Sequence, residues 1–263
     1  MTQPEVEIFV LGPIDIRGAA HRFSRKAARE LAVYLAFHRS GVRNDVWADA
    51  LWPDRRIATP TMHSTSSDAR RALGRSVTGA EHLPRLGRSV RLEDSVGTDV
   101  EQFARAASST DPRRWKEALG LVRGRLFEGM HMTDWAVLDG TQAEVESMVV
   151  TTALRGAEHC LRHGLGEEAE WMVRRALRAS PYDERLYRAL LRAAECQGNP
   201  SGIRSAMSDL LSVMGESGDA VRATPFGKRY RPIPLSIHPQ TLALYRELAH
   251  DEVPGARGGA VRL

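Results

Sequence analysis

The stretch ATPTMHSTSSDARRALG, residues 58–74, decides the fold of the N-terminal part of this 263-residue chain. Thr59 is typical of a helix N-cap, and Pro60 suits the first helical position, where its missing N–H is not needed. Small and apolar residues then recur at helical spacing, which predicts an amphipathic helix. Its inward side chains are expected to be Met62, Ser66, Ala69 and Leu73. The face expected to lie outward is short, polar and net basic, and comprises Thr61, His63, Ser64, Ser67, Asp68, Arg70 and Arg71.

The sequence before this helix predicts a small sheet and two more helices. VEIFVLGPIDIRG, residues 6–18, has an apolar run, a Gly-Pro break and an alternating piece, which indicates two strands, and a third is expected at His21–Phe23. From Ser24 as N-cap, an amphipathic helix is expected to bury Ala27, Leu31, Tyr34, Leu35 and His38. A shorter helix within RNDVWADALWPD, residues 43–54, is expected to bury Val46, Ala50 and Leu51.

The sequence after the helix predicts a basic β-hairpin. LPRLGRSVRLED, residues 83–94, alternates around Leu86 and Gly87, with Arg85, Arg88 and Arg91 on the arms. A small sheet, three helices and a hairpin follow one another in the order of a winged helix, whose third helix enters the major groove while the wing lies along the backbone. The N-terminal part is therefore predicted to be a winged helix-turn-helix with a small β-sheet.

The distribution of charge agrees with an N-terminal part that faces an anion. Residues 1–98 hold 15 Arg and Lys against 11 Asp and Glu, whereas residues 99–263 hold 22 of each, so the whole net charge of +4 lies in the first third. No run reaches the roughly 18 apolar residues of a membrane span, and the first residues are acidic rather than basic. A cytoplasmic protein without membrane contact is expected.

The remaining sequence predicts a helical repeat. Two helical segments are expected in residues 99–130, separated at Asp111-Pro112, and one or two more before Gly164. Gly164 and Gly198 lie 34 residues apart, which is the tetratricopeptide period. Four further pairs are in step with them: Ala157/Leu191, Cys160/Ala194, Ala169/Ile203 and Leu177/Leu211. Stacked helix pairs of this kind form a groove suited to partner segments. The chain is therefore predicted to be mainly α, with a winged helix at 1–98, a tetratricopeptide-like α-helical domain at 99–250 and a disordered tail at 251–263.

Both parts resemble one known family. The Leu-Gly-Pro at residues 11–13, the Ala-Leu-Trp-Pro at 50–53 and the Arg-Arg-Ala-Leu-Gly at 70–74 are similar to the DNA-binding half of the actinobacterial antibiotic-regulatory-protein (SARP) family of transcriptional activators. The segments DVEQFARA, RGRLFEGM, SPYDERLYRALLRAAECQGN and HPQTLALYREL resemble its bacterial transcriptional activation domain. The resemblance implies an activator that binds promoter repeats in double-stranded DNA, pairs as a homodimer on them, and contacts RNA polymerase.

The resemblance does not extend over residues 215–236. Glycine and three prolines predict a loop there, and its basic cluster at residues 228–231 is read as solvated rather than as an anion contact.

Asp68 leaves the function open. The resemblance implies arginine at this position and valine at Ser66. A carboxylate is repelled by DNA phosphates, but it can accept a hydrogen bond from cytosine N4 in the major groove. Asp68 could thus read a base, repel DNA, or form a salt bridge with Arg71 or Arg75.

The candidate DNA-binding residues lie on the predicted third helix and the wing. Hydroxyl and guanidinium groups can donate to phosphates or base edges, although each alone could equally be solvated surface. His63 is read as a DNA contact rather than a metal ligand, since no second His or Cys lies at ligand spacing. The set comprises Thr61, His63, Ser64, Ser67, Asp68, Arg70, Arg71, Arg85 and Arg88.

No motif predicts catalysis. A phosphate-binding loop, a nucleophile elbow and a zinc-protease helix are all missing from the sequence, so no enzyme, cofactor or metal site is expected. Cys160 and Cys196 are expected to be reduced core thiols. Two functions remain open. One is a transcriptional regulator, and the other is a tetratricopeptide-like interaction module with weak or lost DNA binding, which could belong to a larger protein.

Overall fold

The structure is a computed structural model that describes residues 4–131, 134–214 and 237–250. It divides into two compact units, one of Met1–Thr110 with Gly120–Met148 and the other of Asp111–Leu119 with Val149–Leu263. The predicted loop at 215–236 and the predicted tail at 251–263 lie outside the described residues. Within the described ranges, no helix is long and apolar enough to cross a membrane.

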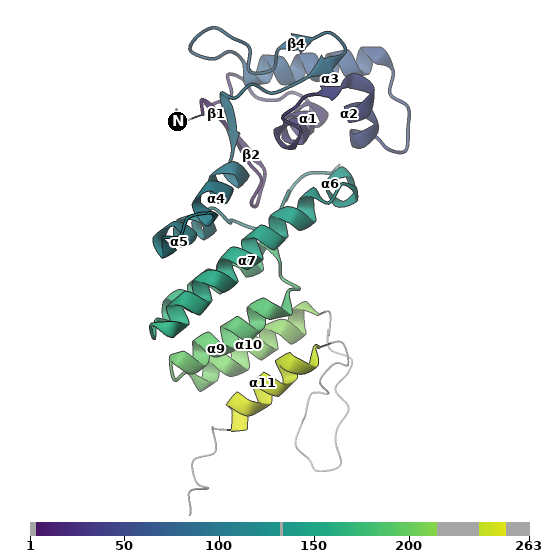
Figure 1. Cartoon of the computed structure of the whole chain (residues 1–263). Coiled ribbons are helices and arrows are strands. Elements are labelled where there is room, and N and C mark those ends of the chain that lie inside the picture. The colour runs from purple at the N-terminus through teal and green to yellow at the C-terminus, as the bar shows by residue number, and fades with distance from the viewer. Residues whose placement is uncertain (1–3, 132–133, 215–236, 251–263) are drawn as a thin grey trace, which may run out of the picture. The chain divides into compact units, whose positions relative to one another are not determined.

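A three-stranded sheet forms one part of the N-terminal unit. β1 (Val6–Phe9) pairs antiparallel with β2 (Asp15–Arg17) and parallel with β6 (Val96–Thr98). The order is therefore β2-β1-β6, and Figure 1 labels β1 and β2. The first two strands confirm the prediction, whereas the expected strand at His21–Phe23 is wrong. The His21 N–H donates to the Ala72 carbonyl at 3.0 Å, so this segment runs beside the end of the third helix.

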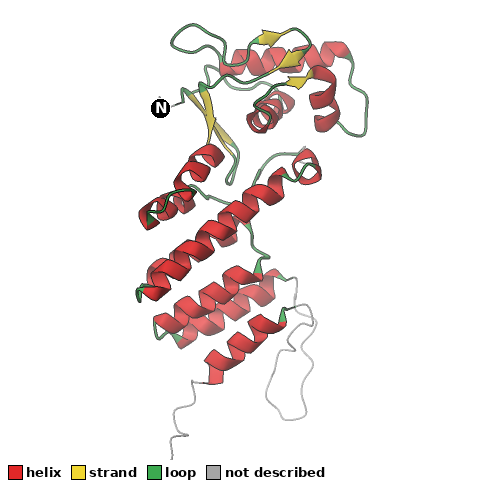
Figure 2. Cartoon of the chain, viewed as in Figure 1, coloured by secondary structure: helices red, strands yellow, loops and turns green. Residues whose placement is uncertain are grey.

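Three helices follow in the predicted order, as Figures 1 and 2 show: α1 (Lys26–Phe37), α2 (Asn44–Leu51) and α3 (Thr59–Leu73). α1 is buried on most of its circumference rather than along one stripe, because Ala28, Ala32 and Val33 are buried as well. In α2 the expectation for Val46 is wrong. Its side chain is 48% exposed, and the larger apolar surface of the neighbouring Trp47 is fully buried instead.

The buried face of α3 differs from the predicted one. Ala69 and Leu73 are buried as expected, but Met62 and Ser66 are partly exposed. The inward face is completed by Thr65, Asp68 and Ala72. At Gly74, φ is +82°, and a Cβ would lie 2.5 Å from the Ala20 Cβ, so only glycine fits where the chain leaves the helix.

The predicted hairpin is confirmed. β4 (Arg85–Leu86) and β5 (Ser89–Val90) pair antiparallel around Gly87, whose φ of +62° suits a tight turn. β5 also pairs with β3 (Val42–Arg43), which gives a second sheet in the order β3-β5-β4. The winged helix-turn-helix expected from the sequence is therefore the fold of this region.

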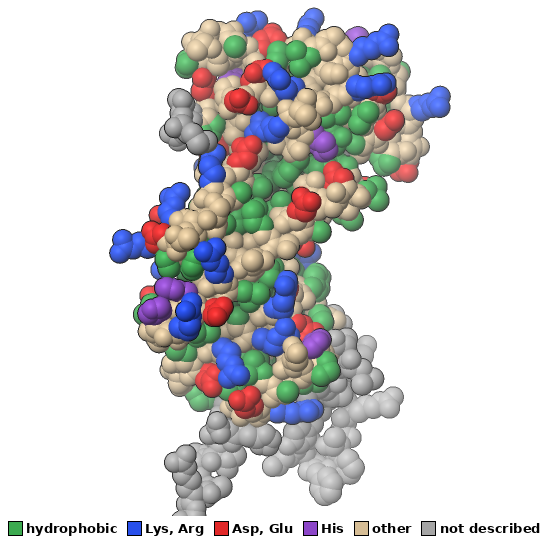
Figure 3. Space-filling model, viewed as in Figure 1, with side chains coloured by type: hydrophobic (Ala, Val, Ile, Leu, Met, Phe, Trp, Pro, Cys, Tyr) green, Lys and Arg blue, Asp and Glu red, His purple; other side chains and the backbone are tan. Residues whose placement is uncertain are grey.

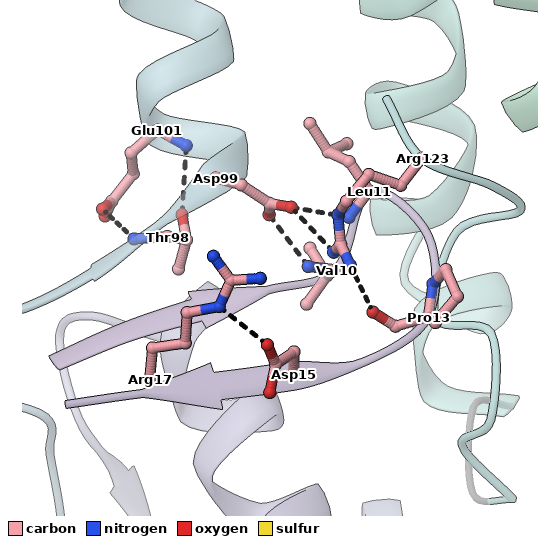
Figure 4. Close-up of polar contacts among 9 residues, drawn as sticks. All are labelled: Val10, Leu11, Pro13, Asp15, Arg17, Thr98, Asp99, Glu101 and Arg123. Carbon is pink, nitrogen blue, oxygen red and sulfur yellow. Dashed lines mark hydrogen bonds and ion pairs between the residues drawn. The ribbon is translucent and has the colours of Figure 1, made fainter. Parts of the chain in front are cut away.

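α4 (Asp99–Ala107) is joined to the first sheet by buried polar contacts (Figure 4). Asp99 is fully buried, and its carboxylate accepts from the backbone N–H groups of Val10 at 2.9 Å and Leu11 at 3.0 Å. Arg123 lies 3.4 Å from the same carboxylate. The compact unit that holds the winged helix therefore extends beyond residue 98, and the domain boundary expected there stays a prediction.

The other elements are helices. α5 (Pro112–Gly120) confirms the predicted break at Asp111-Pro112. α6 (Asp134–Leu138) and α7 (Thr141–Arg162) follow. The helical unit continues with α8 (Gly166–Ala179), α9 (Glu184–Cys196), α10 (Pro200–Val213) and α11 (Pro239–His250).

The 34-residue period corresponds to a structural repeat. Gly164 follows α7 and Gly198 follows α9, both with positive φ, of 72° and 59°. α9 packs against α8 and α10. Of the two cysteines, Cys160 is buried as expected, but Cys196 at the end of α9 is exposed, so a core position for it is wrong.

Candidate nucleic-acid interface

The outer face of α3 carries part of the predicted set. Thr61, His63, Ser67 and Arg71 are exposed, and the Arg71 side chain has 65% of its surface accessible. Lys and Arg side chains are spread over the N-terminal unit in the upper part of Figure 3. Short polar side chains on such a face allow a helix backbone to approach a nucleic acid closely, and the arginine supplies charge.

A mainly apolar hollow of about 850 Å³ lies in the helical unit, and a second, more polar one of about 370 Å³ lies between α3 and the β4–β5 wing. The residues that line the second hollow are Asn44, His63, Ser66, Ser67, Arg70, Arg85, Gly87, Ser89 and Val90. Three members of the predicted set on the helix thus meet one member on the wing. The hollow adjoins the outer face of α3, so a ligand on that face can also reach the wing.

Arg70 holds the wing rather than pointing outward. Its side chain is only 13% exposed, its Nε donates to the Leu83 carbonyl at 2.8 Å, and Glu81 lies 3.4 Å away. Burial and then the positive charge of Arg85 lower the pKa of Arg70, against the opposing effect of Glu81. The predicted outward orientation is therefore wrong, because the guanidinium fixes the segment that leads into the wing.

The wing is fixed at its turn as well. The Asn44 N–H donates to the Arg88 carbonyl at 2.8 Å, and the Asn44 side chain accepts from Trp47 Nε1 at 3.1 Å. Arg85 and Arg88 are exposed, as a backbone-contacting wing requires. The start of α2 and the buried Trp47 thus set the position of these two arginines.

Asp68 is buried, and its expected outward position is wrong. Only 4% of its side chain is exposed, because it lies against the N-terminus of α1. Its carboxylate accepts from the Ser24 hydroxyl at 2.5 Å and from the Arg25 N–H at 3.1 Å, and it forms an ion pair with Arg71. Of the three roles left open by the sequence, the salt bridge with Arg71 is the one observed, and a buried carboxylate has no access to a base edge.

The environment of Asp68 favours its charged form. Burial alone would raise the pKa of the carboxyl group. The hydrogen bonds from Ser24, the Arg25 N–H and Arg71, with the charge of Arg71, outweigh burial and lower this pKa below its usual value. The charged carboxylate therefore stabilises the fold.

Asp68→Asn should remove a pH-dependent part of the stability. Because folding lowers the pKa of Asp68, its contribution is complete above the unfolded pKa of about 4 and is lost as the pH falls through the folded pKa. The difference in free energy of unfolding between wild type and Asp68→Asn should therefore be constant near neutrality and shrink below about pH 4. Urea unfolding at several pH values measures it, with the exposed Asp94→Asn as control. A difference that is independent of pH would contradict this account.

Two residues of this region have no signal in the sequence. Arg25 lies off the apolar stripe of α1, and its Nη1 donates to the Ser64 hydroxyl at 2.7 Å. Asn44 reaches the wing and the hollow. Both contacts join segments distant in sequence, so only the packing of α1 and α2 against α3 and the wing reveals them.

Comparisons with known proteins address both parts of the chain. The family model of the bacterial transcriptional activator domain matches residues 89–202. The structure of Mycobacterium tuberculosis EmbR in complex with a low affinity phosphopeptide is similar, with 20% sequence identity and a TM-score of 0.60. The similarity covers 95% of this chain and 66% of that chain. No curated protein sequence matches.

The structural similarity spans both the winged helix and the helical unit, and at this identity it shows the fold alone. The matched domain begins at residue 89, within the wing, and ends in α10. Both findings agree with the resemblance seen in the sequence. Residues 89–202 are therefore similar to the bacterial transcriptional activator domain, and the chain shares its fold with EmbR.

Proposed function

We propose that the chain regulates transcription by binding a promoter repeat in duplex DNA through α3 and the β4–β5 wing. The observation that carries the proposal is the exposed polar face of α3 beside a wing whose two arginines are exposed. Thr61, His63 and Ser67 would face base edges or phosphates, and Arg85 and Arg88 would contact the backbone. RNA polymerase or a second copy of the chain would contact the helical unit.

The first experiment identifies the DNA. The full chain is incubated with a library of random duplexes, bound molecules are sequenced, and genome-wide crosslinking in the host is compared with the result. A shared, spaced repeat recovered by both methods is expected. Well-folded protein that enriches no sequence and gives no crosslinking peak would overturn the proposal.

Arg85→Ala/Arg88→Ala should weaken binding to the selected duplex by about 100-fold, through loss of about two phosphate contacts. The slope of log affinity against log salt should become shallower by about two, since each lost contact releases about one fewer counterion. Fluorescence anisotropy across salt concentrations measures both quantities. Arg178→Ala/Arg246→Ala removes the same charge from exposed positions in the helical unit and should change neither. Equal affinities and equal salt slopes for the two double variants would contradict the assignment of Arg85 and Arg88 as phosphate contacts.

A second candidate function is an interaction module without strong DNA binding. It is favoured by the hollow of about 850 Å³ in the helical unit, which is lined by side chains of α7, α9 and α11 and is rich in apolar surface. Stacked helix pairs commonly bind partner segments in such grooves. This candidate predicts no enrichment of any duplex and no crosslinking peak, so the same experiment separates the two functions.

A further inference from the structure

The N-terminus of α1 and the middle of α3 share one polar cluster. α1 has no side-chain cap from its own N-cap residue, Arg25. Asp68 of α3 supplies the missing acceptor, because its carboxylate binds the Arg25 N–H and the Ser24 hydroxyl. A carboxylate at a helix N-terminus is favourable both for the unpaired N–H groups and for the helix dipole. The cluster therefore fixes α1 and α3 to each other.

The same cluster anchors two exposed arginines. Arg71 pairs with Asp68, and its Nη2 lies 3.4 Å from the Ser24 hydroxyl. Arg25 donates from Nη1 to Ser64. A guanidinium has five N–H donors, so each arginine keeps donors for a ligand after these contacts. Both side chains are exposed, whereas the carboxylate between them is buried. A ligand approaching this surface meets the two cations first.

The two arginines lie on a different side of α3 from the wing. His63, Ser67 and Arg70 are spaced three or four residues apart and face the hollow beside the wing. Ser64, Asp68 and Arg71 repeat the same spacing one position further on and face α1. The exposed face of α3 therefore lies between Arg85 of the wing on one side and Arg25 and Arg71 on the other. A helix in a major groove lies between two phosphate backbones, so each border faces one of them.

We propose that Arg25 and Arg71 bind backbone phosphate of the strand away from the wing, and that Asp68 is a positioning residue that holds both arginines for this contact. The inference rests on the proposed DNA binding by α3. It gives Asp68 a role that favours DNA binding, although its charge alone would repel DNA.

The test uses the full chain and the duplex recovered by selection. Arg25→Ala and Arg71→Ala should each weaken binding about tenfold, as expected for a charge-assisted hydrogen bond. Each should also make the salt slope shallower by about one. Arg71→Lys should keep the slope, because the charge remains, and lose part of the affinity, because the fork of donors is lost. Arg178→Ala is the control and should match wild type.

Asp68→Asn gives the most direct test of positioning. If the carboxylate only repelled DNA, its removal would tighten binding. If it positions Arg25 and Arg71, the variant should bind more weakly, with a shallower salt slope, although its net charge has risen by one. Affinity is measured well below the unfolding temperature of the variant, which is determined by circular dichroism, so that unfolded protein does not account for the loss.

The outcomes distinguish failure of the proposed function from failure of the inference about Arg25, Arg71 and Asp68. Wild-type protein that binds no duplex would overturn both the proposed function and this inference. Binding that depends on Arg85 and Arg88 but is unchanged in Arg25→Ala and Arg71→Ala would overturn only the inference. Tighter binding by Asp68→Asn would overturn the positioning role and assign to Asp68 the repulsion expected from its charge.

Discussion

Asp68→Arg should destabilise the N-terminal unit by about 3–5 kcal/mol and should not strengthen DNA binding. The substitution leaves the Ser24 hydroxyl and the Arg25 N–H without their acceptor. It also places a second cation beside Arg71 at a position where the present side chain is only 4% exposed. A change of this size is a large fraction of the stability of a typical domain.

Urea unfolding followed by tryptophan fluorescence measures this effect, because Trp47 and Trp52 are buried in the same unit. Ser67→Arg is the matched control. It introduces the same side chain at the neighbouring, exposed position of α3 and should leave the unfolding midpoint near that of wild type. Equal midpoints for Asp68→Arg and Ser67→Arg would show that Asp68 is not needed at the junction of α1 and α3.

Asp99→Ala should lower the free energy of unfolding by about 2–4 kcal/mol. The backbone N–H groups of Val10 and Leu11 would lose their acceptor in a buried environment, and Arg123 would lose its ion partner. Part of this cost is offset, because burying a carboxylate is itself unfavourable. Burial raises the pKa of Asp99, although the two N–H groups and Arg123 oppose the shift.

Asp15→Ala is the control for this substitution. Asp15 lies in the same region (Figure 4), but its side chain is 47% exposed. Among the residues drawn there, it contacts only the exposed Arg17. The free energy of unfolding of Asp15→Ala should stay within about 0.5 kcal/mol of that of wild type. Urea unfolding of the three proteins provides the comparison. A loss of stability in Asp15→Ala as large as that in Asp99→Ala would contradict the role of the buried contacts.

Asp68 and Asp99 should respond oppositely to acid. The pKa of Asp68 is lowered on folding, so protonation of this group destabilises the fold as the pH falls. The pKa of Asp99 is raised, so its charged form is the less favourable one in the fold, and protonation of this group relieves that cost. Sensitivity to acid should therefore be reduced by Asp68→Asn and not by substitutions at Asp99.

Most elements could be predicted because their signals are local. Pro60 near the start of α3, the alternation around Gly87 and the spacing of Gly164 and Gly198 each identify an element within its own stretch of sequence. The face that an element buries depends on its neighbours instead. Asp68 is polar and helical spacing predicts it outside, but the N–H of Arg25 at the start of α1 makes the inside the favourable position for it.

The candidate interface was only partly predictable for the same reason. The exposed positions of Thr61, His63, Ser67 and Arg71 follow from helical spacing. Arg70 has the same residue type as Arg71, and only the position of the Leu83 carbonyl makes it a support of the wing. Arg25 becomes a candidate because α1 meets α3 at Ser64. Contacts between distant segments carry this information, and residue spacing does not.

The hydrogen bonds from the backbone of Val10 and Leu11 to Asp99 limit where the winged helix can be cut from the chain or transferred between proteins. The first helix after the winged helix completes the hydrogen bonding of the first strand, and Arg123 adds a second tie from further along the chain. A fragment ending at residue 98 would expose those backbone groups and should be unstable. Exchange of the proposed DNA specificity between relatives should therefore succeed only when the transferred piece extends past Asp99 to Arg123.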